Sequence, residues 1–156
     1  MKSNFLSAAA KSGFIAGLIF LILEMIMVPL FLNGSPWGPP RMIAAIILGE
    51  NVLPPPASFD LTIVMVALIL HFILSIVYAL IIGLFVSKAN ATIAVIVGIG
   101  AGLLIYFVNF YRFTSQFPWF AMARNWVSIF AHAVFGLSAA LAFKAFYKSI
   151  DMRFAE

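Results

Sequence analysis

Four polar residues inside apolar segments are the positions of this chain whose side chains could do chemistry: Glu24, His71, Asn109 and His132. A carboxyl group and two imidazoles can take up and release protons, and together with an amide oxygen they can bind a small cation. Ionisable groups are unfavourable in hydrocarbon, so each one becomes a candidate functional residue if its segment crosses a membrane. The surrounding segments therefore decide what these side chains can do.

The composition is that of an integral membrane protein. Of the 156 residues, 65% are hydrophobic and 9% are charged, and the mean hydropathy is +1.15. An ordinary soluble domain is about 45–50% apolar and about 25% charged. The 9 basic and 5 acidic residues are too few to cover a water-soluble globule of this length. The absence of cysteine excludes disulfides, thiolate zinc sites and iron–sulfur clusters.

Four apolar stretches are long enough to cross about 30 Å of hydrocarbon, which takes about 20 helical residues. They cover residues 13–32, 61–86, 92–111 and 126–146, and none alternates as a strand would. We therefore expect an all-α membrane protein with a single domain, 1–156, and four transmembrane helices.

A proline-rich outer loop, 33–60, joins the first two spans. Its apolar part, 42–48, is too short to span and predicts a short interfacial or re-entrant helix. Because proline restricts the backbone, we expect this loop to form a stiff lid over the polar residues.

The basic residues predict that both termini are cytoplasmic. With the amino terminus inside, six basic residues are cytoplasmic and three are outside, which agrees with the positive-inside rule. The inner six are Lys2, Lys11, Lys88, Lys144, Lys148 and Arg153, and the outer three are Arg41, Arg112 and Arg124. The pI of about 9.7 then reflects this asymmetry and contact with lipid headgroups, and not binding of nucleic acid.

The two halves of the chain are similar. When the first half of the chain is aligned with the second, Glu24 aligns with Asn109 and His71 aligns with His132. We expect two similar helical hairpins related by a pseudo-twofold axis along the membrane normal, unless the likeness is chance similarity between apolar segments.

Small residues at a spacing of four predict close helix packing. We expect these residues to pack helices of the same chain together, and not to form a dimer, because the helices that carry them first need neighbours within the chain. The residues on these stripes are Gly13, Gly17, Ser75, Ala79, Gly83, Gly98, Gly102, Gly136 and Ala140.

Depth along the helices places three of the polar residues in one layer. With a rise of about 1.5 Å per residue, His71, His132 and Glu24 lie about 16, 12 and 14 Å from the outer ends of their spans. Asn109 is expected nearer the outer surface.

Several chemistries could use this polar layer. His71 and His132 could be the axial ligands of a b-type haem, whose propionates could meet Arg41, Arg112 or Arg124. The same two histidines with Glu24 could instead hold a divalent metal. A third reading is a relay for protons or small cations, with the three arginines as an outer gate.

A purely structural reading is also open. In it the two histidines bond each other or Ser75 and Ser138, and Glu24 pairs with an outer arginine. No nucleophile with its base and no phosphate-binding glycine loop is present, so we expect no enzyme activity.

Several segments of the chain resemble those of a known group of membrane proteins. Ala16-Gly17 and Glu24-Met25, the S-P-W-G-P-P-R-M-I-A-A-I segment at 35–46, and the helix with His132 and Gly136 are together similar to small four-helix bacterial inner-membrane proteins. Some of these look like the YagU-like family, and some are labelled sodium:proline symporters. The resemblance implies a bacterial inner-membrane location.

The leading hypothesis from the sequence is a non-enzymatic, homo-oligomeric protein that moves protons or small cations. The alternatives are a haem-binding electron-transfer or respiratory accessory subunit, and a structural or assembly protein.

Overall fold

The chain folds into a bundle of helices. The computed structural model describes residues 2–153, and the side chains of residues 4–147. Within this part there are four long apolar helices, a shorter helix between the first and the second, and no strand, which confirms the predicted helical class. The side chains of Lys2, Lys148 and Arg153, which contribute to the predicted cytoplasmic charge, lie outside the described ones.

The five α-helices are α1 (Lys2–Leu32), α2 (Gly38–Leu48), α3 (Leu61–Val86), α4 (Ala91–Phe107) and α5 (Trp126–Arg153). A 3-10 turn, η1 (Glu50–Val52), follows α2. A π-helical turn, η2 (Val108–Arg112), continues α4, and the 3-10 segments η3 (Phe113–Ser115) and η4 (Pro118–Ala123) lead on to α5. The α-helix of the third span thus ends before the predicted boundary at 111, and the last helix continues past 146.

The first helix begins well before the predicted start at residue 13. Its early turns carry polar residues, which hid them from a search for apolar runs. They are nevertheless helical, and Ala8, Ala9 and Ser12 are fully buried there. Burial of these small side chains against the bundle extends the helix toward the amino terminus.

Side-chain caps fix where three of the long helices begin. In each case a carboxylate or amide oxygen accepts a hydrogen bond of 2.9–3.0 Å from the backbone N–H three residues later, which satisfies a donor left free at a helix start. The capping residues are Asp60 for α3, Asn90 for α4 and Asn125 for α5.

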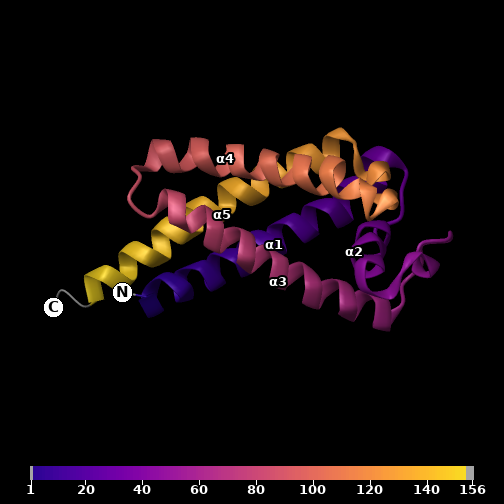
Figure 1. Cartoon of the computed structure of the whole chain (residues 1–156), viewed down its shortest axis with the longest axis horizontal. Coiled ribbons are helices and arrows are strands. Elements are labelled where there is room, and N and C mark those ends of the chain that lie inside the picture. Colours follow the sequence, from indigo (N-terminus) through magenta and orange to yellow (C-terminus); the bar gives the residue numbers. More distant parts are fainter. Residues whose placement is uncertain (1, 154–156) are drawn as a thin grey trace.

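The long helices run alternately up and down the bundle. α5 packs along both α1 and α4, and α1 also packs along α3. The two termini lie at one end, together with the turn between α3 and α4, and α2 lies at the opposite end (Figure 1). We call the end with α2 the lid end, and the other the terminal end. The lid end is the side that the charge distribution predicts to face outward.

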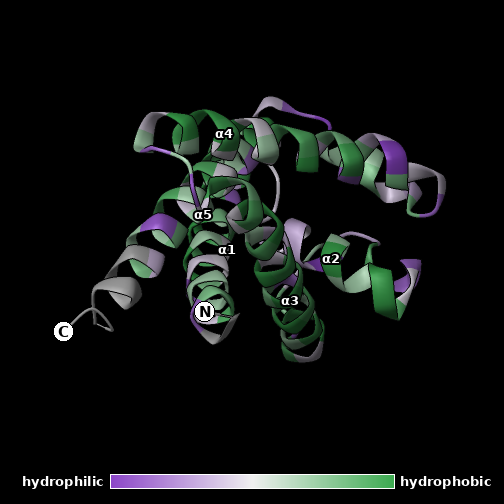
Figure 2. Ribbon diagram, turned by 60° about the vertical axis from the view of Figure 1, so that its left-hand side comes forward, coloured by the Kyte–Doolittle hydropathy of each residue, from purple (hydrophilic) through white to green (hydrophobic). Residues whose placement is uncertain are grey.

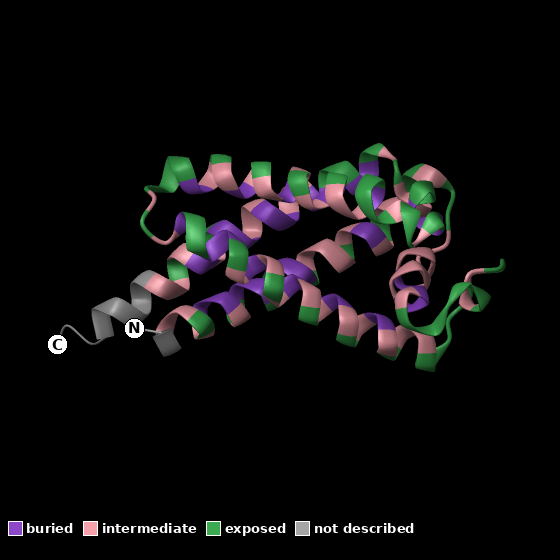
Figure 3. Cartoon of the chain, viewed as in Figure 1, coloured by how far each residue is buried: buried purple, intermediate pink, exposed green. Residues whose placement is uncertain are grey.

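Small side chains fill the half of the bundle toward the terminal end. One buried cluster joins alanines from α1, α3, α4 and α5 with a few larger side chains, among them the fully buried Phe143. Buried positions follow the inward edge of each helix, whereas the outward edges are exposed (Figure 3). Close packing here leaves the larger open space at the lid end.

The outer surface of the long helices is apolar. Large side chains such as Ile22, Ile69, Leu104 and Phe130 are exposed, with 46–64% of their surface accessible. Hydrophobic residues follow the long helices around the bundle, and polar residues gather near helix ends and in the connecting segments (Figure 2). Such a surface suits a bilayer, where the helices also satisfy their own backbone hydrogen bonds.

Candidate functional site

A cavity of about 480 Å³ opens into the bundle toward the lid end. All four of the predicted polar residues line it: Glu24 from α1, His71 from α3, Asn109 from η2 and His132 from α5. Most of the remaining lining is apolar. The cavity reaches the surface beside Gly34 and Met122, which are both exposed. The sequence-predicted layer therefore forms part of one concave site.

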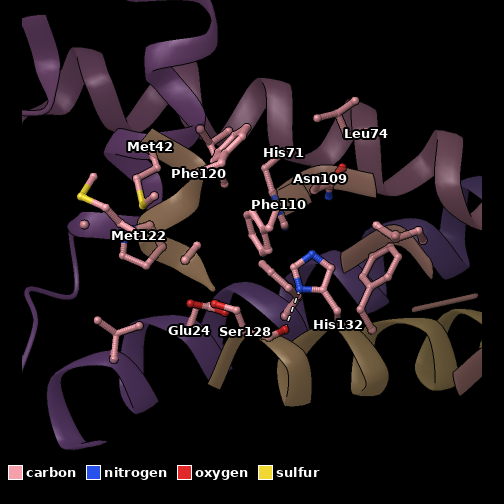
Figure 4. A pocket seen from close by; sticks show the side chains of 18 of the residues that line it. Glu24, Met42, His71, Leu74, Asn109, Phe110, Phe120, Met122, Ser128 and His132 are labelled. Carbon is pink, nitrogen blue, oxygen red and sulfur yellow. Dashed lines mark hydrogen bonds between the residues drawn. The ribbon is translucent and has the colours of Figure 1, made fainter. Parts of the chain in front are cut away.

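Glu24 lies on α1 and is buried, with 4% of its surface exposed. Its carboxyl group lies beside the hydroxyl of Ser128 in the first turn of α5 (Figure 4). Oxygen Oε1 is buried and has no hydrogen-bond partner among the described residues. A buried polar atom without a partner is unfavourable, and it is commonly explained by an unseen ligand, water or proton.

Glu24 pairs with no arginine in the described part of the chain, contrary to the structural reading. Arg41 donates to the carbonyls of Val52 and Ser58, and Arg124 donates to the carbonyl of Phe110. Arg112 is exposed. None of the three is among the residues that line the cavity, so the outer gate stays a prediction.

His71 lies on α3 with its ring against α1. Its Nε2 lies 2.9 Å from the carbonyl oxygen of Gly17. A carbonyl only accepts, so Nε2 carries the hydrogen, and in the neutral ring Nδ1 keeps its lone pair. Glycine at position 17 allows the two helices to come this close. A Cβ there would lie 2.6 Å from the hydroxyl oxygen of Ser75 on α3.

The ring of His132 also bonds a backbone carbonyl, in this case one of its own helix. Its Nδ1 lies 2.7 Å from the carbonyl oxygen of Ser128, one turn earlier on α5, so Nδ1 is the donor. The other ring nitrogen points away from Ser128 into the cavity (Figure 4). The backbone partners of both histidines differ from the hydroxyl groups of Ser75 and Ser138 that the structural reading proposed; the Ser138 hydroxyl donates to the carbonyl of Val134 instead.

Aromatic rings surround the two imidazoles. Phe20 packs against both, with centroid distances of 5.6 Å to His71 and 4.8 Å to His132. Tyr106 and Phe110 contact His132 by their edges, at 5.7 and 5.2 Å. These ring contacts give both imidazoles a largely apolar surrounding.

This geometry does not fit a haem between the two histidines. Phe20 packs against both rings, where a flat porphyrin would have to lie. In addition, Nε2 of His71 is used as a donor to Gly17 and has no lone pair for an iron. The metal reading gains no support either, since no three His, Asp or Glu side chains of the described part lie close enough to hold one ion.

Asn109 bonds a side chain of α3. Its Oδ1 accepts a hydrogen bond of 3.0 Å from the hydroxyl of Tyr78, two turns past His71 on that helix. Asn109 lies in the π-helical turn η2, and the Arg124 guanidinium supports that turn at Phe110. π-helical turns are frequent at functional sites because they redirect side chains.

Sequence reasoning missed two residues of the site, Ser128 and Tyr78. Ser128 lies one helical turn before His132, and Tyr78 lies two turns after His71, so each shares a face with a histidine already singled out. Helical spacing could have found both. Hydroxyl groups escaped notice because they cost little in an apolar helix compared with charged groups.

Two outer segments cover the cavity. Residues of α2, among them Met42 and Ile46, form one wall, and Phe117 and Phe120 near η4 form another. The indole N–H of Trp119 donates to the carbonyl of Met42 at 3.0 Å and joins the two segments. The proline-rich loop thus contributes its helix to the wall of the site.

The small residues of the predicted stripes bring the helices into close contact, and one of them, Ser75, also lines the cavity. Gly13 and Gly17 approach α3 at Ser75, and Gly98 and Gly102 approach α5 at Gly136. A Cβ on Gly102 would lie 2.0 Å from the carbonyl oxygen of His132, so the backbones themselves are in contact. The other predicted members, Ala79, Gly83 and Ala140, are buried in the same half of the bundle.

Comparison with known proteins gives no independent indication of a function. No family model matches this chain, and no curated protein or solved structure shows significant similarity to it. The chemistry of the cavity is therefore the guide to what the protein does.

Proposed function

We propose that this protein is a non-enzymatic, multi-pass protein of the bacterial inner membrane that moves protons or small cations through its cavity, with Glu24 as the exchanging group. The observation that carries the proposal is the buried Oε1 of Glu24, which has no hydrogen-bond partner among the described residues and belongs to a side chain that lines an open cavity. A carboxyl group in this setting can satisfy that oxygen with a proton or with a bound cation.

The neighbouring side chains can pass a proton to and from Glu24. Ser128 lies beside the carboxyl group, and the imidazoles of His71 and His132 each keep one ring nitrogen free of the backbone bond. Hydroxyl and imidazole groups both donate and accept, which is what a proton path requires. Asn109 and Tyr78 add a second polar pair at the same cavity.

The close packing at the terminal end of the bundle supports an assembly of more than one copy of this chain. Alanines, glycines and Phe143 fill the terminal half of the bundle, so an ion that reaches Glu24 meets close-packed helices. Movement across the whole membrane then requires a rearrangement of this half or a path at the contact with a second copy. We propose a homo-oligomer for this reason.

The proposal includes the predicted orientation and the internal repeat. The terminal end faces the cytoplasm, because it carries Lys11, Lys88 and Lys144. The matched contacts of Gly17 with Ser75 and of Gly102 with Gly136 support a repeat of two hairpins.

The test is proton flux in liposomes that hold the purified protein. A pH-sensitive dye inside the liposomes reports proton entry when a potassium diffusion potential is applied. Wild type and Glu24→Gln are compared, because the amide has nearly the same size and cannot exchange a proton. We expect flux in the wild type and flux at the level of empty liposomes in the variant.

Glu50→Gln is the matched control, because Glu50 is exposed in η1 and does not line the cavity. It should leave flux unchanged. Equal flux in wild type and Glu24→Gln, with both eluting as folded particles in detergent, would remove Glu24 from the path. Absence of flux in the wild type would leave the polar residues with the structural role of fixing helix register.

A further inference from the structure

We infer that the solute bound at Glu24 is a lipophilic organic cation, meaning a molecule that carries one positive charge on a mainly apolar or aromatic body. This inference rests on the proposed function and names its substrate class. Its first support is size. A volume of about 480 Å³ lies within the range of about 300–1,000 Å³ that is usual for sites of small organic molecules, and a bare proton path does not need it.

The charges around the cavity select for a cation. The lining contains one carboxyl group, Glu24, and no Lys or Arg among the described residues. The other titratable groups that face Glu24 across the cavity are His71 and His132, with Tyr78 farther along α3. An anion would meet the Glu24 carboxylate with no cationic side chain to pair with it, which is strongly unfavourable away from water.

The aromatic lining suits an organic cation better than a hydrated inorganic one. Ring faces attract positive charge, most strongly when the cation has lost its water. Small inorganic cations instead need a shell of several oxygen ligands, and Ca²⁺ for example takes six to eight. Most of the side chains that line this cavity are apolar. The aromatic residues are Phe20, Tyr78, Phe110, Phe113, Phe117, Phe120 and Phe135.

The unpartnered oxygen of Glu24 gives the cation a specific place. A neutral apolar molecule would fill the cavity and leave Oε1 without a partner, whereas a cation would pair with it. When the carboxyl group is protonated beforehand, cation binding releases that proton to the outer solution, and the carboxylate and the cation form a neutral pair. Proton release upon binding is therefore the signature of this site.

The experiment uses tetraphenylphosphonium, an organic cation that has no exchangeable proton. Its binding to the purified full-length protein in detergent is measured by equilibrium dialysis, and proton release is followed in weakly buffered solution. We expect saturable binding, with a proton released for each cation bound. Glu24→Gln should bind at least about tenfold more weakly and release no proton. Glu50→Gln should behave as the wild type.

Tetraphenylborate is the matched control ligand, because it has the same shape and the opposite charge. It should not bind, and this comparison needs no variant. Equal binding of both ions to the wild type, or equal binding of the phosphonium to wild type and Glu24→Gln, would overturn the inference. Absence of phosphonium binding together with Glu24-dependent proton flux would overturn it too, while the proposed function stands. Loss of both would remove the proposed function as well.

Discussion

At the scale of single residues, the identity of the polar groups could be predicted but their partners could not. Glu24, His71 and His132 stand out because ionisable groups are rare in apolar helices, and their depth follows from the helical rise. Their partners depend on how the helices cross. Glu24 meets Ser128 because α5 packs along α1, and no pattern within α1 indicates this contact.

The histidines illustrate the same limit. The structural reading had the two histidines bond each other or the hydroxyl groups of Ser75 and Ser138. The imidazoles bond backbone carbonyls of Gly17 and Ser128 instead. Glycine lets α3 come close enough for a side chain to reach the backbone of α1, and a carbonyl one turn away is within reach of a histidine on its own helix.

Accessibility of the site can be tested at Ser128. The chain has no cysteine, so a single Ser128→Cys variant carries the only thiol and changes one atom. Ser128 lines the cavity, and we expect this thiol to react with a small cationic methanethiosulfonate added to the purified protein. Labelling is followed by mass spectrometry over time.

Ser12→Cys is the matched control for this measurement. Ser12 is also a buried serine of a long helix, but it does not line the cavity, and its surface exposure is 0%. Its thiol should react far more slowly. Equal rates at the two positions would contradict a cavity that reaches Ser128, since both thiols would then depend on the same general opening of the bundle.

At the scale of elements, the ends of helices were predictable where caps or apolar runs mark them. The predicted span 61–86 coincides with α3, whose start is capped by Asp60. The start of α1 was predicted too late because polarity hid its first turns. The π-helical turn η2, which holds Asn109, could not be foreseen, since nothing in the sequence distinguishes it from α-helix.

Close backbone contact between α4 and α5 gives a prediction on stability. Gly102→Ala places a Cβ 2.0 Å from the carbonyl oxygen of His132, so the helices must move apart. We expect a loss of about 1–3 kcal/mol in the free energy of unfolding, as in overpacked cores. Unfolding in detergent mixtures measures it.

Gly100→Ala is the control on the same helix, because a Cβ at Gly100 meets nothing within 4 Å. It should leave stability unchanged or raise it by up to about 1 kcal/mol, since alanine favours helix more than glycine does. If both substitutions changed stability alike, the contact at Gly102 would not be the cause.

At the scale of the whole molecule, the apolar composition was sufficient to predict the class. So few charged groups cannot cover a soluble fold, and the exposed apolar side chains of all four long helices follow from the same fact. The cavity could not be predicted from composition. The terminal half of the bundle is closely packed, whereas at the lid end residues of α2 and η4 form part of the cavity wall.

The orientation in the membrane gives a prediction at this scale. Asn51 lies at the lid end and Lys88 at the terminal end, and both side chains are exposed. In intact cells, a thiol reagent that cannot cross the inner membrane should label Asn51→Cys and leave Lys88→Cys unlabelled until the cells are opened. The reverse pattern would place the cavity on the cytoplasmic side.

The central claim is that Glu24 takes up and releases the proton at this cavity. Infrared difference spectroscopy of the purified protein tests it directly, because a protonated carboxyl group has a carbonyl stretch that disappears on ionisation. We predict that raising the pH removes such a band in the wild type and in Glu50→Gln, and that Glu24→Gln shows no corresponding change. The same carboxyl band change in wild type and Glu24→Gln would contradict the account, since another group would then carry the proton.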